Sequence, residues 1–550
     1  MQTIILTLDN GEKKEYIKGI KVKEVIENLK STNCHDIISV KYNNRFVNYE
    51  DTLLKNGKIS LYDINTKQGN KIYERGLIYL FELCAIEVLG VDTKIVVKFS
   101  IDKGIYCQID KNITMDDVNN IKKVMKEKVK ECIPFTRIET TKSEAMEYFK
   151  SIKREDKIRT LFYNRANTIT MYKLDDMYNY ITGDLPNDTG VLKYFDLSLI
   201  KNHGIVVRFP SIYDDCKIVK YTHHEHYFNS LEEYSNWGNN LNLNNLGDLN
   251  EFITNNNQED IIQLSEIMQD YKLLNIAEQI VLNKDDYKII LLSGPSSSGK
   301  TTTSMKLSLY LKSLGLNPNH LSLDDYFHER VETPLAANGK PDFESLKAID
   351  IKLFDSQISK LLKGTKVTVP TYNFIEGKKE YKRTITLKEN DILIIEGLHA
   401  LNEELLTNIP RKKKLKVYLS PLTYLNIDND NRIGMTDLRL LRRMVRDNRT
   451  RGYSPSKTLN SWADVRSGEE KYVFPFQDHA DIMFNTSLAY ELAVLKTYAE
   501  PLLFTIAEDD PEYSTAQRLL ELLKYVLPIP SESIPKTSIL REFIGGSYFE

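Results

Sequence analysis

Apolar and polar residues alternate over residues 2–8, which predicts a strand with one buried face. An Asn-Gly pair at residues 10 and 11 follows, and this dipeptide is typical of a tight hairpin turn. Short strands are predicted again at 38–41 and 58–62. Between the hairpin and these two strands, four apolar residues fall at helical spacing: Val22, Val25, Ile26 and Leu29. Residues 1–62 therefore form a small β-rich unit with one helix.

The pattern changes after residue 62. Residues 63–235 form the next region, and residues 236–285 are predicted as an Asn-rich, then helical, linker. From 286 to 530, apolar strand candidates alternate with helical stretches: 288–292, 319–323, 391–395, 415–419 and 481–485. This alternation is typical of βαβ units and a parallel sheet, so the fold class is α/β multidomain. Residues 531–550 form a C-terminal tail without a functional interpretation.

Composition and charge exclude several classes of protein. The 74 Lys and Arg residues almost balance 77 Asp and Glu, and the net charge of −3 supplies no general field for a polyanion. The five cysteines are odd in number and form no C-x-x-C pair, which argues against a disulfide framework or a zinc knuckle. The first residues lack a signal-peptide pattern and no apolar run reaches about 18 residues, so we expect a cytoplasmic protein without membrane contact.

The strongest chemical motif begins directly after the strand predicted at 288–292. Residues 294–301, Gly-Pro-Ser-Ser-Ser-Gly-Lys-Thr, match the P-loop pattern G-x-x-x-x-G-K-[ST], with a helical stretch behind them. Such a loop points backbone N–H groups at the phosphates of ATP, while Lys300 reaches the β- and γ-phosphates and Thr301 offers a hydroxyl to Mg²⁺. The residues predicted to bind the nucleotide in this loop are Gly294, Ser296, Ser298, Gly299, Lys300, Thr301 and Thr302.

Two further strands end in acids. Asp324 and Asp325 follow the strand at 319–323, at the edge where ligands of open α/β sheets bind, and a carboxylate there can accept the proton of an attacking hydroxyl. A helix cap or a surface acid is the alternative for each. Glu396 follows the strand at 391–395, which is typical of an acid that holds Mg²⁺ or its water shell.

A basic stretch follows at 439–452, and Arg439, Arg442, Arg443 and Arg446 fall at helical spacing on one face. A solvated basic helix is the ordinary interpretation. Because transfer of a γ-phosphoryl group needs charge stabilisation and a closing lid, the P-loop upstream favours a lid.

Together these motifs resemble the uridine kinase and phosphoribulokinase family. Gly-x-Ser-x-Ser-Gly-Lys-Thr-Thr, Leu-Ser-x-Asp-x-Tyr/Phe, Pro-x-Tyr-x-Phe, Ile-x-Glu-Gly and Arg-Arg-x-x-Arg-Asp-x-x-x-Arg-Gly occur in the family's order. The resemblance implies that Asp324 is the general base, with Lys300 and Arg446 also catalytic, and that Thr301 and Glu396 bind Mg²⁺. It also implies substrate contacts from Tyr326, Phe343, Glu344, Tyr372, Phe374 and Arg443, and nucleotide contacts from Arg443 and Arg451.

This sequence departs from that family at two places. The base-reading His that follows the Tyr-x-Phe motif is replaced by Gly377, and the His-Pro-Asp after the ribose acid is replaced by residues 345–347, Ser-Leu-Lys. The motifs therefore predict which nucleobase the substrate carries less firmly than they predict the kinase chemistry.

The N-terminal half resembles part of the threonyl-tRNA synthetases. The ββαββ order of residues 1–62 is similar to their ubiquitin-like TGS domain. Segments of 63–235 are similar to their editing domain, namely 96–106, a helix at 115–131, 143–149 and 187–193, and this resemblance implies an α+β fold. The positions that carry His-x-x-x-His and Cys-x-x-x-His in that family are Arg75 and Tyr79, and Ile181 and Leu185, here. We expect a scaffold without editing chemistry. One remaining His-rich run, residues 223–226, is expected to lie on the surface rather than to bind zinc.

The leading hypothesis is an ATP- and Mg²⁺-dependent kinase of the 5′-hydroxyl of uridine, with cytidine as a second candidate. One alternative is a kinase of another sugar or hydroxyl metabolite on the same fold. Another is an RNA-binding regulatory ATPase in which the TGS-like module is the functional part. The expected partners are a small-molecule substrate, further copies of the chain in a homo-oligomer, and RNA at the N-terminal module.

Overall fold

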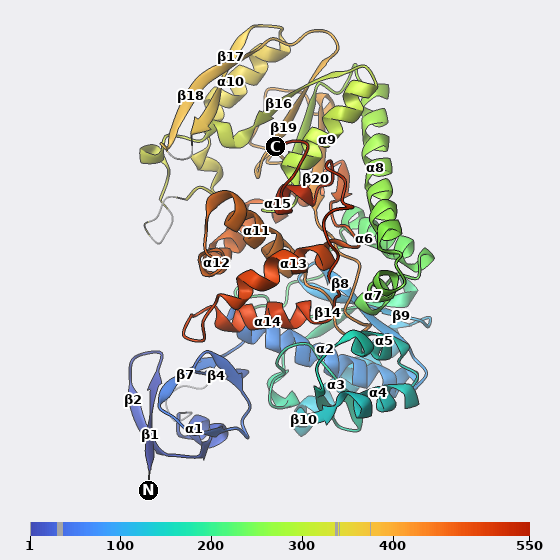
Figure 1. Ribbon diagram of the computed structural model, residues 1–550, viewed down its shortest axis with the longest axis vertical. Coiled ribbons are helices and arrows are strands. Elements are labelled where there is room, and N and C mark those ends of the chain that lie inside the picture. The colour runs from blue at the N-terminus through green and yellow to red at the C-terminus, as the bar shows by residue number, and fades with distance from the viewer. Residues whose placement is uncertain (1, 30–36, 336–338, 340–341, 374–375) are drawn as a thin grey trace.

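The computed structural model describes residues 2–29, 37–335, 339, 342–373 and 376–550. Figure 1 shows a small N-terminal lobe at one end of the molecule, a mixed α/β region beside it, and the P-loop region at the other end. Within the described residues, no helix is long and apolar enough to cross a lipid bilayer.

The N-terminal lobe is a five-stranded sheet with one helix. Its strands lie in the order β2-β1-β7-β4-β5, and the two central strands, β1 and β7, run parallel. The apolar face of helix α1 (Val22–Leu29) packs on this sheet, as its periodicity predicts. The strands of the lobe are β1 (Thr3–Leu8), β2 (Lys13–Ile17), β3 (Ile20–Lys21), β4 (Ser39–Tyr42), β5 (Arg45–Val47), β6 (Thr52–Leu53) and β7 (Gly57–Tyr62).

The next region combines two antiparallel sheets with helices. One sheet has the order β13-β14-β9-β8 and the other β10-β11-β12. The predicted helix at 115–131 is confirmed as α3 (Met115–Glu131), which Thr114 and Asp117 begin with a capping box. The other elements are α2 (Lys67–Leu89), β8 (Ile95–Ile101), β9 (Gly104–Ile109), β10 (Thr136–Thr141), α4 (Lys142–Ser151), α5 (Glu155–Tyr163), β11 (Thr168–Leu174), β12 (Met177–Asn179), β13 (Asp196–Ile200) and β14 (Gly204–Arg208).

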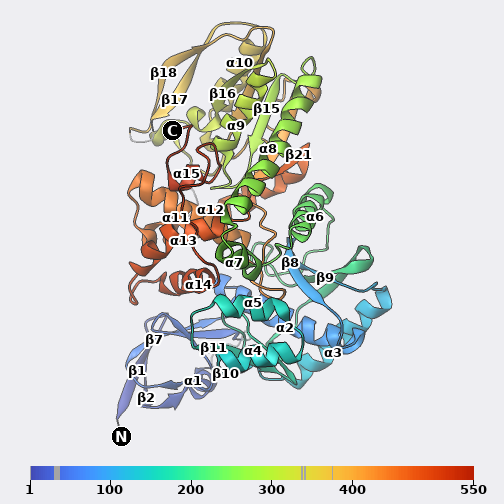
Figure 2. The same cartoon turned by 45° about the vertical axis from the view of Figure 1, so that its right-hand side comes forward.

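Three helices join this region to the P-loop domain: α6 (Glu225–Asn240), α7 (Leu246–Thr254) and α8 (Gln258–Leu282). Helix α8 runs along the side of the P-loop domain and ends shortly before its first strand (Figure 2).

The P-loop domain contains the predicted parallel sheet, in the order β16-β19-β15-β20-β21. Because all five strands run the same way, their carboxyl ends meet at one edge, where the P-loop and the predicted acids lie. The strands are β15 (Ile289–Ser293), β16 (Asn317–Ser322), β19 (Asp391–Glu396), β20 (Lys414–Ser420) and β21 (Ile482–Asn485). The helices are α9 (Lys300–Ser313), α10 (Ile351–Leu362), α11 (Met435–Arg451), α12 (Pro455–Tyr472), α13 (Glu491–Phe504), α14 (Tyr513–Leu523) and α15 (Arg541–Ile544). An antiparallel hairpin of β17 (Val367–Asn373) and β18 (Lys378–Ile385), which the sequence pattern did not indicate, projects beside the sheet.

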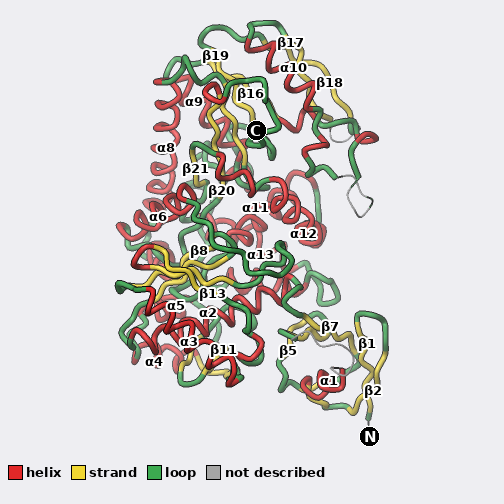
Figure 3. Tube along the Cα trace, turned by 180° about the vertical axis from the view of Figure 1, so that it is seen from behind, coloured by secondary structure: helices red, strands yellow, loops and turns green. Residues whose placement is uncertain are grey.

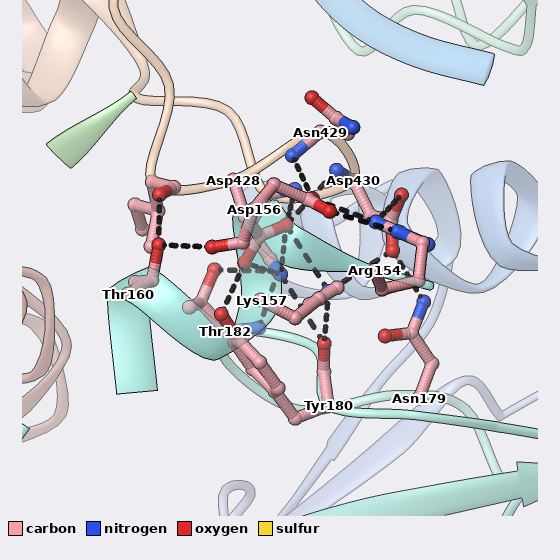
Figure 4. A network of polar contacts seen from close by, with 12 residues as sticks. Arg154, Asp156, Lys157, Thr160, Asn179, Tyr180, Thr182, Asp428, Asn429 and Asp430 are labelled. Atoms are coloured by element: carbon pink, nitrogen blue, oxygen red, sulfur yellow. Dashed lines mark hydrogen bonds and ion pairs between the residues drawn. The ribbon is translucent and has the colours of Figure 1, made fainter. Parts of the chain in front are cut away.

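The P-loop domain and the mixed region share one hydrophobic core and one buried ionic network. Residues of α4 and α5 belong to the same buried cluster as β15 and β20. In Figure 4, Lys157 of α5 lies between Asp428 and Asp430, at 3.0 and 2.9 Å from their carboxylate oxygens. Arg154 also binds Asp430, at 2.9 Å. The side chains of Lys157, Asp428 and Asp430 are buried, and that of Arg154 is largely buried. The segment 426–434 of the P-loop domain is therefore fixed on the mixed region just before α11 begins.

Candidate active site

The phosphate-binding loop lies between β15 and α9, as the motif predicts. Gly294 and Gly299 are required sterically, because a Cβ at Gly294 would collide with the carbonyl oxygen of Leu419 and Gly299 adopts φ +83°. Ser297 also adopts a positive φ, 59°, which tightens the loop. The loop therefore presents the N-terminus of α9 at the edge of the sheet, where backbone N–H groups attract anions.

The side chains of the loop are arranged around this anion site. Lys300 donates to the carbonyl oxygens of Gly294, at 2.9 Å, and Pro295, at 3.2 Å. Thr301 is exposed at the start of α9, and the buried Ser298 hydroxyl has no hydrogen-bond partner in the described part of the chain. An ammonium group and open hydroxyls are therefore available beside the N–H groups of the loop.

Three carboxyl groups surround Lys300, and the pKa of each is raised. Asp324, in the 3-10 turn after β16, is accessible to solvent yet closely surrounded by protein, and this desolvation raises its pKa against the opposing charge of Lys300. Burial and the neighbouring Asp324 raise the pKa of Glu396 to about 7. Burial and Glu469 raise the pKa of Glu344 to about 7. The positive charge near Asp324, Glu344 and Glu396 is therefore too small to keep all three acids ionised as readily as they would be in water.

Helix α11 does not present all of its arginines to the phosphate site. Arg439 and Arg442 are almost completely buried and donate to the backbone of the loop, Arg439 to the Ser296 oxygen at 3.0 Å and Arg442 to the Ser297 oxygen at 3.4 Å. The spacing predicts one cationic face, but its arginines have two roles. Arg439 and Arg442 are buried and hold the backbone of the loop, so they are not exposed to a bound phosphate.

The remaining arginines of α11 gather on one acid. Arg443, Arg446 and Arg451 lie 3.2, 3.1 and 3.3 Å from the buried carboxylate of Asp447. Arg443 also donates to the Ser296 hydroxyl at 2.8 Å, which places it on the phosphate loop. Asp447 therefore holds the three predicted lid arginines in one orientation.

Glu469 of α12 is a site residue that the motif analysis missed. Its Oε1 accepts the N–H of Ser296 at 2.8 Å and also pairs with Arg439. It lies 17 residues beyond the last family motif, and only the fold of α12 against α11 brings it to the loop.

The aromatic residues occupy two different places. Phe327 lies between Phe343 and Tyr372, with ring centroids 6.0 and 5.8 Å away. Tyr326, predicted to contact the substrate, is instead fully buried, donates to Gln357 at 2.9 Å and packs on Phe354. Its substrate role is thus replaced by a core role, since a 3-10 turn directs successive side chains to different sides. Phe374 lies outside the described residues.

Gly377 adopts φ +73° in the turn between β17 and β18. A Cβ there would lie 2.8 Å from the Cβ of Arg330, and the two residues are joined by a backbone hydrogen bond of 3.0 Å. A histidine at 377 would therefore be strained as well as obstructed by Arg330.

A contact from the far end of the chain reaches the phosphate loop. The Glu542 carboxylate of α15 accepts the Thr302 N–H at 3.2 Å and the Thr302 hydroxyl at 2.8 Å. Figure 1 shows α15 beside α11, close to the start of α9. The predicted nucleotide ligand Thr302 is thus bound to an acid of the segment 531–550, for which the sequence suggested no function.

Arg75 and Tyr79, two of the four positions that the resemblance to the editing domain singles out, are engaged in hydrogen bonds to backbone oxygens. Tyr79 is buried and donates to two carbonyl oxygens, while Arg75 donates through Nε to the Asp184 oxygen at 2.8 Å. In the histidine run, His224 binds Asp102 and Asp478, and no group of three metal-binding side chains forms among the described residues.

Comparisons with known proteins agree with this geometry. Residues 289–492 match the sequence profile of the Phosphoribulokinase / Uridine kinase family. The chain is 28% identical over 207 residues to a uridine kinase of Staphylococcus epidermidis, and the alignment covers 38% of this chain and 91% of that protein. It is 30% identical over 200 residues to a uridine kinase of Borreliella burgdorferi, covering 36% of this chain and 85% of that protein.

Among solved structures, a possible uridine kinase from Bacillus stearothermophilus is similar at 20% identity, with a TM-score of 0.23, over 39% of this chain and 98% of that one. The sequence matches lie in the C-terminal part of the chain and include the P-loop, the acids and the arginines of α11. The protein is an ATP-dependent phosphotransferase, and its chain belongs to the phosphoribulokinase and uridine kinase family.

Proposed function

We propose that the protein transfers the γ-phosphoryl group of ATP to the 5′-hydroxyl of uridine, and of cytidine as a second substrate. The observation that carries this proposal is that Asp324 feels the charge of Lys300 and shares its 3-10 turn with Phe327, whose N–H donates to the Asp324 carbonyl oxygen at 3.5 Å. The Phe327 ring in turn contacts Phe343 and Tyr372. A flat base against these rings would direct a sugar hydroxyl toward the carboxylate.

Asp324 is the proposed general base. A carboxylate whose pKa is raised binds a proton more readily than an ordinary aspartate, so Asp324 can accept the proton that the 5′-hydroxyl loses as it attacks phosphorus. Lys300 neutralises charge on the transferred group, and Arg443, Arg446 and Arg451, oriented by Asp447, close over it.

Mg²⁺ fits the acids of the site. Glu396 and the exposed hydroxyl of Thr301 are oxygen donors of the type Mg²⁺ prefers, and the raised pKa of Glu396 indicates a shortage of positive charge around it. When bound, the ion would neutralise negative charge on the phosphates.

Glu344 is the proposed ribose contact. Its carboxylate lies in the electrostatic environment of Asp324 and Arg443 and can accept hydrogen bonds from the 2′- and 3′-hydroxyls. A deoxyribose offers one of these donors fewer, so a site that binds ribose in this way discriminates against it.

The test is ATP consumption by the full chain with Mg²⁺ across nucleosides, sugars and polyols, with each product identified by mass. We expect uridine and cytidine to exceed purine nucleosides in kcat/KM, and 2′-deoxyuridine to be at least ~10-fold poorer than uridine. Phosphorylation of another hydroxyl compound in their place would reject the nucleoside assignment and keep the kinase. ATP hydrolysis that requires RNA would reject both in favour of the regulatory ATPase.

For residues 1–235 we propose a TGS-like lobe followed by an editing-like domain that has lost its chemistry. Arg75, Tyr79, Ile181 and Leu185 supply no metal ligand, nucleophile or general base, so the full chain should not deacylate mischarged threonine-type tRNA. Deacylation above the rate without protein would contradict this proposal. The homo-oligomer and the RNA contact stay predictions.

A further inference from the structure

A cavity of about 520 Å³ lies away from the phosphate loop, where the N-terminal lobe, the mixed region and the P-loop domain meet. This volume falls in the range of small-molecule sites. Its wall combines residues around Arg45 of β5, one side of α2, the segment 430–434, the first turn of α11 and part of α14. Nothing in the kinase chemistry uses this cavity.

Most acids in the wall already have cationic partners. Asp184 instead is partly buried without an ion pair among the described residues; desolvation raises its pKa, and Arg75 is the first charge that opposes this rise. Glu74 lies 2.5 Å from Arg432, and Asp437 pairs with Arg518. Asp430 is held by the buried network of Figure 4. Most of the negative charge around the cavity is thus neutralised by the protein.

Two cations of α2 are less fully engaged. Within the described residues, Arg75 uses only Nε, and the nearest carboxylate oxygen to the Lys71 ammonium group is 3.9 Å away, on Asp437. Asp437 favours the charged form of Lys71, but burial and Arg518 outweigh it and lower its pKa to about 8. An ammonium group in this state would gain from a nearby anion.

We propose that this cavity binds a small anionic metabolite through a phosphate or carboxylate group placed between Arg75 and Lys71. Arg75 supplies a planar pair of N–H donors and Lys71 a point charge, which together suit such a group. The same wall is continuous with α11, whose Arg439 and Arg442 support the phosphate loop.

The test titrates inorganic phosphate and succinate by calorimetry into the full chain with Lys300→Ala, which weakens anion binding at the phosphate loop. Binding that is left at the N–H groups of the loop should not depend on Arg75. We expect one of them to bind, Arg75→Gln to weaken that binding at least ~10-fold, and Lys71→Gln to weaken it less. Arg137→Gln, an exposed arginine outside the cavity, is the matched control. Unchanged affinity in a folded Arg75→Gln protein, or no binding of either anion up to about 10 mM, would overturn the proposal.

A second, independent observation concerns the segment 531–550. Arg449 of α11 donates to the backbone oxygens of Glu542 and Phe543 and forms an ion pair of 2.6 Å with Glu550. Phe543 is fully buried, with the Arg442 guanidinium 5.0 Å from its ring. The segment is therefore firmly packed on the lid helix, with the Glu542 carboxylate on the first turn of α9.

From this geometry we infer that Glu542 occupies the place of an ATP phosphate and that the segment holds the enzyme in a self-inhibited state. The Thr302 N–H cannot serve a carboxylate and a phosphate at once, and two anions at one helix terminus repel each other. ATP must displace the carboxylate of Glu542. The apparent affinity for ATP is therefore the intrinsic affinity multiplied by the fraction of molecules in which Glu542 has left Thr302.

Glu542→Gln should therefore tighten the binding of ATP, measured without acceptor, by roughly 5- to 20-fold. Arg449→Gln, which releases the segment without touching Thr302, should act in the same direction. Glu532→Gln, at an exposed acid of the same segment, should have no effect. Unchanged or weaker ATP binding in Glu542→Gln would overturn the inference and would make Glu542 an ordinary or metal-binding part of the site.

Discussion

Two groups of carboxylates in this protein differ in what neutralises them. Around Lys300, Asp324, Glu344 and Glu396 have raised pKa values, because burial and repulsion between acids exceed the opposing effect of Lys300 and of the nearby Arg443 and Arg451. In the network of Figure 4, burial alone would also raise the pKa of Asp430, but Arg154 and Lys157 bring it well below its usual range.

The difference separates a site from a structural joint. The joint carries its own cations and is complete as folded, so it fixes the segment 426–434 on the mixed region (Figure 3 shows the two regions from behind). The acids around the P-loop stay unbalanced until a cation binds. Unbalanced acids in an accessible position are a common sign of a functional site.

The largest effect is expected at Lys300. Lys300→Ala removes the charge that the phosphate loop presents and should lower kcat by at least ~10³-fold, because phosphoryl transfer depends on electrostatic stabilisation. The melting temperature should stay within a few degrees, since among the described residues the hydrogen bonds of the ammonium group go to two loop carbonyls. Near-normal turnover in this variant would contradict the assignment of the loop.

The next effect distinguishes neighbouring acids. Asp324→Asn should lower kcat by about 10²–10⁴-fold with little change in ATP affinity, because a general base acts in the chemical step. Asp325→Asn is the matched control: Asp325 accepts the Tyr372 N–H at 3.0 Å, so its loss should disturb the hairpin more than the chemistry. Equal losses of nucleotide affinity and kcat at Asp324 would point to metal binding instead.

In the structural joint the same type of change should affect folding. Lys157→Met conserves volume but leaves the buried Asp428 without its ion-pair partner and Asp430 with Arg154 alone, which should cost about 3–5 kcal/mol in the free energy of unfolding. Urea denaturation measures this cost, and Lys130→Met, at an exposed lysine of α3, provides the control. A large loss of kcat in the folded fraction with unchanged stability would mean that Lys157 serves catalysis and not the stability of the joint.

Much of the fold was predictable because its signals are local. Alternation, helical spacing and apolar runs identify β1, α1 and the parallel strands to within a few residues, and a family resemblance identifies α3. The P-loop, Asp324 and Glu396 were found because a motif and the end of a strand place each of them on one edge of the sheet.

The residues that sequence reasoning missed act through contacts distant along the chain. Glu469 reaches Ser296 across 173 residues, and Glu542 reaches Thr302 across 240. Tyr326 was misassigned because a motif gives the order of residues in a 3-10 turn and not the side to which each points. Arg439 and Arg442 share a helical face with Arg443, but only the packing of α11 on the loop determines which of them is buried.

The smallest effect concerns the stability of the unbalanced acids themselves. The pKa of Glu344 is about 7 in the folded chain, above its unfolded value of about 4.3, so the folded state holds an extra proton between these pH values. Stability should therefore fall as pH rises through this window, and the cost is fully present above pH 7. Glu344→Gln removes the ionisation, and because the side chain is partly accessible we expect a gain of only about 1–2 kcal/mol at pH 8. The gain should vanish near pH 4.5, where the parent carboxyl is protonated in the folded chain. Melting temperatures with EDTA at both pH values measure it, with Glu532→Gln as the control. A gain of equal size at both pH values would mean that packing, and not charge, distinguishes Glu344 from glutamine.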